Sequence, residues 1–179
     1  MAAIRGAFVA ENRADNTFLV DREVFASEEL LQREWDRIFR TCWIYVGHTS
    51  EVRQPGDFRT RQIAGRPIIF CRDQDGQIRA MLNVCSHRGA TVCREREGNT
   101  RGFYCMYHGW TFKPDGRLHA VPGIEDYGPR FDREAHALKQ VPRFESYRDF
   151  WFLNFNPDAP ALVDYLAGAK DYIDLVVEQ

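Results

Sequence analysis

Two short stretches decide the fold of this chain: Cys85-Ser86-His87-Arg88-Gly89 and Cys105-Met106-Tyr107-His108-Gly109-Trp110. Each stretch offers one thiol and one imidazole, and residues 88–104 lie between His87 and Cys105. Thiolate and imidazole are side-chain ligands that proteins use for iron and zinc. The sequence therefore predicts a metal centre held by two loops, with the rest of the chain serving as their frame.

The spacing of these ligands favours an iron–sulfur cluster over a single metal ion. One residue separates Cys85 from His87, so one tight turn can present them to two different irons, and Cys105 and His108 do the same from the second turn. In one class of [2Fe–2S] centre, two histidines replace two cysteines on one iron. A structural zinc site, the alternative, usually takes its cysteines as one close pair and its histidines as another. Visible absorption separates the two alternatives, because a zinc site has none.

Two other features of the loops support a complete set of four ligands. Gly89 and Gly109 follow the histidines, and without a Cβ they let the backbone come close to a cluster, so that peptide N–H groups can point at its sulfides. Cys93 lies only a few residues beyond the first loop. We expect it not to be a ligand, because the set of four is complete without it.

Composition places the chain among ordinary globular proteins. Its 179 residues suffice for one domain with appendages, and 44% of them are apolar against 28% charged. The net charge of −2 gives no general attraction to nucleic acid or to acidic lipid. We find no run of about 20 apolar residues that would span a membrane, and no secretory leader. With an odd number of cysteines, five, these features predict a cytoplasmic protein without a disulfide framework.

The regular elements fall into three predicted regions. Residues 1–40 hold a loosely ordered arm, up to residue 20, and a helix at 24–40 that Ser27 can cap. Residues 41–157 alternate short apolar runs with turns, which is typical of an antiparallel β sandwich or small barrel. Residues 158–179 are predicted to form a second helix, at 161–177. The fold class is therefore mainly β, with the two loops as a cluster-binding subdomain and a helix flanking it at either end.

The predicted N-terminal helix has one apolar face. Its markers, Leu31, Trp35, Ile38 and Phe39, recur at helical spacing. Such a face either packs on the protein's own core or docks on a neighbouring domain or subunit, and the residues alone favour neither alternative.

The two loops and their surroundings resemble one known family. The stretches 85–89 and 105–112 are similar to the Rieske motif of aromatic-ring-hydroxylating oxygenases, in the large (α) subunit. The resemblance extends over about residues 20–179 through these stretches: Trp43-Ile44-Tyr45-Val46-Gly47-His48, Pro55-Gly56-Asp57-Phe58, Asn83, Lys113-Pro114-Asp115-Gly116 and Phe150-Trp151-Phe152-Leu153-Asn154. It implies that Cys85 and Cys105 bind one iron and that His87 and His108 bind the other. It also implies that the cluster is surrounded by Arg88, Gly89, Tyr107, Gly109 and Trp110.

The resemblance implies a role in electron transfer within a dioxygenase, an oxidoreductase. In that family the cluster takes electrons from a ferredoxin or reductase and relays them to a mononuclear non-haem iron in a catalytic domain, held by two histidines and a carboxylate. The remaining histidines, His48, His119 and His136, are scattered, so we predict no catalytic residue here and place that iron outside the chain. The implied partners are the catalytic domain, neighbouring α subunits and, in some assemblies, a β subunit. A free-standing Rieske ferredoxin is the alternative function.

The loops also differ from those of high-potential respiratory Rieske proteins. There an extra cysteine in each loop forms a disulfide, and serine and tyrosine hydroxyls bond to the sulfurs, which raises the potential. The matching positions here are Ala90, Tyr107, Trp110 and Phe112. A low-potential centre is therefore expected, nearer the ~−150 mV end of the Rieske range than the ~+300 mV end.

Charge is concentrated around the loops. Residues 85–119 hold six basic and three acidic side chains, a net of +3, although the whole chain carries −2. This segment is either an ordinary solvated face or a docking patch for an acidic redox partner.

Overall fold

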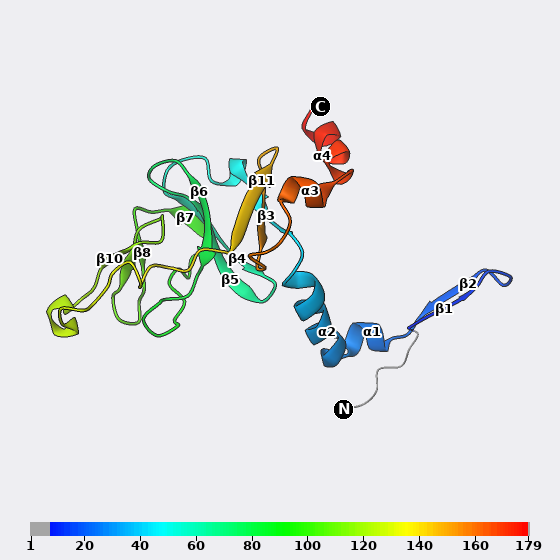
Figure 1. The fold of residues 1–179 in the computed structure, drawn as a ribbon, viewed down its shortest axis with the longest axis horizontal. Coiled ribbons are helices and arrows are strands. Elements are labelled where there is room, and N and C mark those ends of the chain that lie inside the picture. The colour runs from blue at the N-terminus through cyan, green and yellow to red at the C-terminus, as the bar shows by residue number, and fades with distance from the viewer. Residues whose placement is uncertain (1–7, 179) are drawn as a thin grey trace. The chain divides into compact units, whose positions relative to one another are not determined.

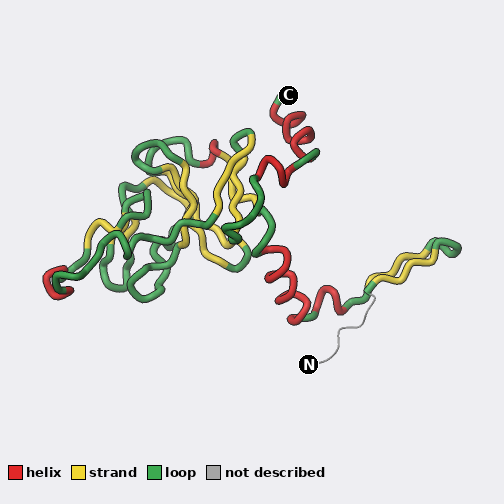
Figure 2. Tube along the Cα trace, viewed as in Figure 1, coloured by secondary structure: helices red, strands yellow, loops and turns green. Residues whose placement is uncertain are grey.

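The computed structural model describes residues 8–178, which divide into two compact units. The first unit ends at Phe39 and the second begins at Arg40. Figure 1 shows the elements of both units, and Figure 2 shows that strands and loops make up most of the second. Among the described residues, no helix is long and apolar enough to cross a membrane.

The first unit is a β hairpin followed by short helical segments. Its elements are β1 (Val9–Asn12), β2 (Thr17–Val20), α1 (Glu23–Ala26), α2 (Glu28–Glu34) and the π-helical turn η1 (Trp35–Phe39). Ser27 Oγ accepts a hydrogen bond from the Leu30 N–H at 3.3 Å, so this residue caps α2 as predicted. The same residue also ends α1, which divides the predicted helix into two pieces.

The hairpin corrects the prediction of a loosely ordered arm. Residues 9–12 and 17–20 pair as antiparallel strands, while residues 1–7 of the predicted arm lie outside the described residues. Asn12 shapes the turn, because its side-chain oxygen accepts from the Ala14 N–H at 3.0 Å. The hairpin was missed because each strand has only four residues and none of them is buried, so no apolar alternation marks it.

Three antiparallel sheets form the second unit, in the orders β6-β5-β4-β7, β11-β12-β3 and β10-β9-β8. Their strands are β3 (Ile44–His48), β4 (Asp57–Ile63), β5 (Arg66–Arg72), β6 (Ile78–Leu82), β7 (Glu97–Asn99), β8 (Phe103–Tyr104), β9 (Thr111–Phe112), β10 (Leu118–Ala120), β11 (Arg143–Tyr147) and β12 (Phe150–Asn154). Two 3-10 turns, η2 (Thr49–Glu51) and η3 (Ile124–Tyr127), and two C-terminal helices also belong to it. The mainly β antiparallel fold is confirmed. Within residues 40–178 the strands do not close into a barrel, so that alternative is wrong.

Two hydrophobic clusters hold these sheets. The first joins the β6-β5-β4-β7 sheet to the β11-β12-β3 sheet through fully buried side chains such as Val46, Phe70 and Leu153. The second surrounds the two Cys/His loops and contains the cysteines of both loops, together with Trp110 and Phe112. The loops are therefore rooted in a packed core, which fixes their position relative to the sheets.

The C-terminal region holds two helices where one was predicted. Ala167, with φ of +44°, ends α3 (Leu162–Leu166) before α4 (Ala169–Val177) begins. The Glu145 carboxylate accepts a hydrogen bond from the Leu162 N–H at 2.8 Å, which satisfies one donor at the start of α3. Leu162 is fully buried, so α3 is anchored on β11, while α4 is held by a separate set of polar contacts.

We expect Asp174→Asn to release α4 from the β11–β12 turn. Arg148 Nε donates to the Asp174 carboxylate at 2.7 Å, and the Tyr147 hydroxyl donates to its two oxygens at 3.0 and 2.9 Å. The bond from Arg148 and then that from Tyr147 lower the pKa of Asp174. The contact is therefore present above the ordinary aspartate pKa and is lost as the pH falls through the lowered value. Amide exchange across 169–177 should accelerate several-fold in the variant at neutral pH.

Asp171→Asn is the matched control for this prediction. Asp171 lies on the same helix, is exposed, and its side chain has no partner among the described residues. Exchange across α4 should be unchanged in this variant. Equal exchange in the two variants would show that Asp174 does not hold the helix.

Candidate metal centre

The two Cys/His loops adopt the same backbone frame. In the first, the Cys85 N–H donates to the Ala90 carbonyl at 2.8 Å, and the Gly89 N–H donates to the Cys85 carbonyl at 2.9 Å. In the second, the Cys105 N–H donates to the Trp110 carbonyl at 2.8 Å, and the Gly109 N–H donates to the Cys105 carbonyl at 2.9 Å. The frames match although the histidine stands two residues after the first cysteine and three after the second.

Glycine is required at the same point of each frame. Gly89 and Gly109 both have φ of +74°, a conformation that strains any residue with a side chain. At Gly109 a Cβ would also lie 2.8 Å from Pro122 Cγ. The glycines singled out in the sequence therefore serve the turn itself, and their closeness to a cluster stays a prediction.

The two loop cysteines are buried next to each other. Cys85 is 3% exposed and Cys105 is 1% exposed. Burial raises the pKa of the Cys85 thiol, and the adjacent Cys105 raises it further through a hydrogen bond and its charge. Two thiolates can persist side by side in this apolar core only if a bound cation compensates their charge, because thiolates are the form that binds metals.

The two imidazoles also lie together. The rings of His87 and His108 have centroids 4.6 Å apart and are inclined by 68°. His87 Nδ1 is buried and has no hydrogen-bond partner among the described residues, which is rare for a ring nitrogen in a folded protein. Burial lowers the pKa of His87, and the nearby His108 and Arg88 add to the effect. The neutral imidazole, which is the metal-binding form, is thereby favoured.

This donor set fits a two-iron cluster better than a single ion. Among residues 8–178, no three His, Cys, Asp or Glu side chains are grouped so that they could hold one metal ion. A zinc site needs all four ligands around one point, whereas a Rieske-type cluster needs one pair of ligands at each of two irons. The adjacent thiols and the adjacent imidazoles form two such pairs.

Aromatic rings lie against both imidazoles. The Trp110 indole stacks on His87, with centroids 4.6 Å apart and planes 6° apart, and the Tyr107 ring lies 3.8 Å from that of His108. Trp110 is buried, whereas Tyr107 is 60% exposed. Arg88, also predicted near the cluster, is exposed, and its side chain forms no hydrogen bond within the described part of the chain.

One residue outside the loops fixes the chain on either side of the first loop. Asn83 follows β6 and is buried; its side-chain oxygen accepts from the Val92 and Cys93 N–H groups at 3.1 and 2.8 Å, and its NH₂ donates to the Cys93 carbonyl at 2.6 Å. The two ends of the loop are thereby joined. The sequence carried only a weak sign of this role, a lone polar residue between an apolar strand and the loop.

The connection after β10 contributes a second support that the sequence did not predict. Ser86 Oγ donates to the His136 carbonyl at 2.6 Å. The His136 ring stacks on Phe131, with centroids 4.7 Å apart, and lies 5.5 Å from Trp110. Ser86 and His136 are 50 positions apart in the sequence, so spacing gave no sign of this contact. His48 and His119 join no metal-binding group within residues 8–178.

Comparison with known proteins places the chain in a family. The Rieske [2Fe-2S] domain family matches residues 42–145. The chain is 39% identical over 176 residues to the toluate 1,2-dioxygenase subunit alpha of Pseudomonas putida, covering 97% of this chain and 39% of that protein. It is 41% identical over 166 residues to the anthranilate 1,2-dioxygenase large subunit of Acinetobacter baylyi, covering 92% of this chain and 35% of that one.

Solved structures agree with this match. Naphthalene 1,2-dioxygenase from Rhodococcus sp., bound to indole, matches with a TM-score of 0.84 and 39% sequence identity. The match covers 88% of this chain and 36% of the dioxygenase chain. A quaternary ammonium Rieske monooxygenase has a TM-score of 0.76 and 33% identity over 86% of this chain and 42% of its own. The chain thus spans between about a third and two-fifths of the relatives it matches. It belongs to the Rieske [2Fe-2S] domain family.

Proposed function

We propose that Cys85 and Cys105 bind one iron of the [2Fe–2S] cluster and that His87 and His108 bind the other. The observation that carries this assignment is the buried, unpartnered Nδ1 of His87 beside the His108 ring. The two adjacent buried thiols support it from the other loop. Gly89 and Gly109 hold both loops in the frame that this arrangement needs.

The cluster, when bound, supplies one-electron redox chemistry. The two sides of the proposed cluster site differ in exposure. The cysteines are buried, the histidines are half-buried, and Tyr107 beside His108 is mostly exposed. Electron transfer slows with distance, so a partner exchanges electrons most readily at the histidine side. Trp110 covers one face of the His87 ring, and His136 packs against Trp110 in turn.

For the whole protein, we propose an oxygenase α subunit that acts on an aromatic compound. Relatives named as toluate and anthranilate 1,2-dioxygenase subunits, which are oxidoreductases, support this proposal. Electrons would come from a ferredoxin or reductase and pass to a mononuclear non-haem iron in a catalytic domain beyond these residues. Neighbouring α subunits and a β subunit are the proposed assembly partners. The proposed compartment is the cytoplasm, in keeping with five cysteines that form no disulfide.

A free-standing Rieske ferredoxin is the alternative. Such a carrier needs only the sheets of the second unit, whereas the resemblance to the toluate dioxygenase subunit covers 97% of the chain. That coverage includes the helices of the first unit and most of α3 and α4, which favours the oxygenase. The downstream reading frame separates the two, because only an oxygenase would continue into a domain with two histidines and a carboxylate at triad spacing.

We expect the iron-loaded chain to hold about two irons and two acid-labile sulfides and to titrate near ~−150 mV. Trp110 and Phe112 are buried at the positions where hydroxyl donors would raise the potential, and Ala90 and Tyr107 cannot form the disulfide. A redox titration followed by EPR measures both the cluster and its midpoint.

Each outcome of this titration tests a different statement. A chain that gives no Rieske EPR signal after loading with iron and sulfide would overturn the ligand assignment. A midpoint above zero would contradict the low potential while leaving the ligands in place. An iron content well above two per chain would contradict the placement of the catalytic iron outside these residues.

A further inference from the structure

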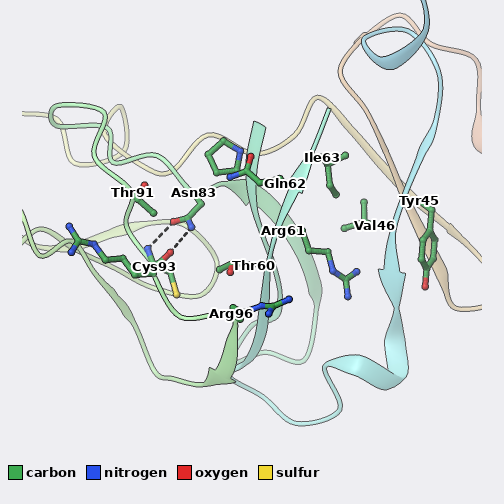
Figure 3. A pocket seen from close by; sticks show the side chains of 12 residues that line it. Tyr45, Val46, Thr60, Arg61, Gln62, Ile63, Asn83, Thr91, Cys93 and Arg96 are labelled. Carbon is green, nitrogen blue, oxygen red and sulfur yellow. Dashed lines mark hydrogen bonds between the residues drawn. The ribbon is translucent and has the colours of Figure 1, made fainter. Parts of the chain in front are cut away.

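A groove of about 960 Å³ lies beside the first Cys/His loop, within the second unit (Figure 3). One wall is the last part of β4, residues 60–63, and the facing wall includes Tyr45 and Val46 of β3. The remaining wall is the stretch from Thr91 to Arg96 that leaves the loop. This volume is at the upper end of the roughly 300–1,000 Å³ of ligand clefts, so the groove has room for several residues of a peptide.

The β4 wall of the groove is a free sheet edge. β7 pairs with β4 only at Asp57–Arg59, and the Thr60 N–H then donates to the Arg96 carbonyl at 2.8 Å. Backbone groups of every second residue point the same way in an antiparallel ladder, so those of Gln62 also face the groove. They have no backbone partner among the described residues. A free edge of this kind is a template for an added strand.

The strand on the opposite side of the groove, β3, is also a sheet edge. β3 is the outer strand of its sheet and pairs only with β12. The groove therefore runs between two sheet edges, and the exposed stretch of β4 is about 13 Å long at roughly 3.3 Å per residue. An extended segment of four or five residues would fill that length.

The charged side chains that line the groove are all basic. Its lining includes Arg61, Arg94 and Arg96 and no acidic residue. Glu95, between two of these arginines in sequence, lines an adjoining hollow instead. Arg61 is already paired with Glu51, but the guanidinium groups of Arg94 and Arg96 form no hydrogen bond or ion pair with any described residue. At least two positive charges are thus available to an occupant.

The wall that carries these charges is held in place. Asn83 makes three hydrogen bonds to Val92 and Cys93, which Figure 3 draws in part between Asn83 and Cys93. Thr60 Oγ1 donates to the Glu95 carbonyl at 2.8 Å from the other side. The segment 92–95 is therefore fixed at both ends before any partner arrives, which lowers the entropic cost of binding.

We propose that this groove binds an acidic, extended segment of a partner polypeptide, which adds as a strand to β4 at residues 60–63. The free backbone groups of Gln62 would pair with the added strand, and Arg94 and Arg96 would pair with its carboxylates. The free backbone edge favours a polypeptide over a small anion, which has no ladder of N–H and C=O groups to offer. This interaction is independent of the electron relay and of the ligand assignment.

The proposal is tested with a fluorescein-labelled hexaglutamate peptide and the iron-loaded full chain. Fluorescence anisotropy should show saturable binding that weakens as salt is added, because exposed charge pairs are screened. The double variant Arg94→Glu/Arg96→Glu should weaken binding by about tenfold or more. Arg101→Glu is the matched control: this arginine is exposed, belongs to the same basic segment and does not line the groove, so binding should stay within about twofold.

Two further measurements test strand addition itself. Hexaglutamate with N-methyl groups at alternate positions cannot donate the ladder bonds and should bind about tenfold more weakly. Amide exchange at Gln62, whose N–H is free in the chain alone, should slow when the unmodified peptide is added, and exchange across β11 and β12 should not change. Equal binding of the methylated peptide, unchanged exchange at β4, or full competition by citrate at the same carboxylate concentration would each overturn the proposal.

Discussion

Cys105→Ser should remove nearly all iron from the chain, from about two atoms to below about 0.2 per molecule. Cys105 is 1% exposed and lies against Cys85 in the apolar core. A serine hydroxyl has nearly the same size but does not ionise at neutral pH, so it supplies no thiolate to an iron. Iron and sulfide analysis of the purified variant, after loading under the same conditions as the parent chain, measures the effect.

Cys93→Ser is the matched control. Cys93 is also buried, belongs to the same hydrophobic cluster and differs from the loop cysteines only in lying outside the two frames. Its thiol donates a weak hydrogen bond to the Glu95 carbonyl at 3.7 Å, which a serine can replace. This variant should keep its full iron content. Loss of iron from both variants would point to a folding defect, and loss from Cys93→Ser alone would contradict the ligand set.

Trp110→Ala should lower the free energy of unfolding by about 3–5 kcal/mol, the range for removing a large aromatic side chain from a core. Trp110 is 1% exposed and contacts the rings of Phe112, Phe131 and His136. Its indole also stacks flat on His87. The variant should therefore lose its visible absorbance at a lower urea concentration and should release iron faster to a chelator.

The conservative variant Trp110→Phe separates packing from support of His87. A phenyl ring retains one flat face for His87 but leaves part of the indole volume empty, so we expect a loss of about 1–2 kcal/mol. Iron release should stay close to that of the parent chain. If Trp110→Ala were as stable as the parent and released iron at the same rate, Trp110 would not support the imidazole.

The sequence predicted the parts of this site that are local. The two loops, their glycines and the strands that lead into them are marked by residues close together, and turn chemistry fixes them. The same holds for Ser27, whose capping role depends only on the Leu30 N–H three residues away.

The parts that were missed depend on contacts between distant residues. Ser86 meets the His136 carbonyl through the path of the connection after β10, and no pattern in either stretch encodes that path. The break at Ala167 is similar, because Glu145 on β11 anchors the start of α3 while Asp174 fixes α4 on a different turn. Alanine ordinarily favours a helix, so its positive φ of +44° reflects tertiary contacts overriding local propensity.

The shared frame of the two loops also separates the residues that make the closing backbone bonds from the exposed residues at the tip of the second loop. The closing bonds of each loop join the backbone of its cysteine to that of its glycine and of the residue after the glycine, whereas Met106 and Tyr107 stand out from the second loop with 66% and 60% of their surface exposed. These tip residues border the half-buried histidine without taking part in the backbone turn. Substitutions at these two positions therefore change the exposed surface beside His108 while the backbone turn of the loop keeps its closing bonds.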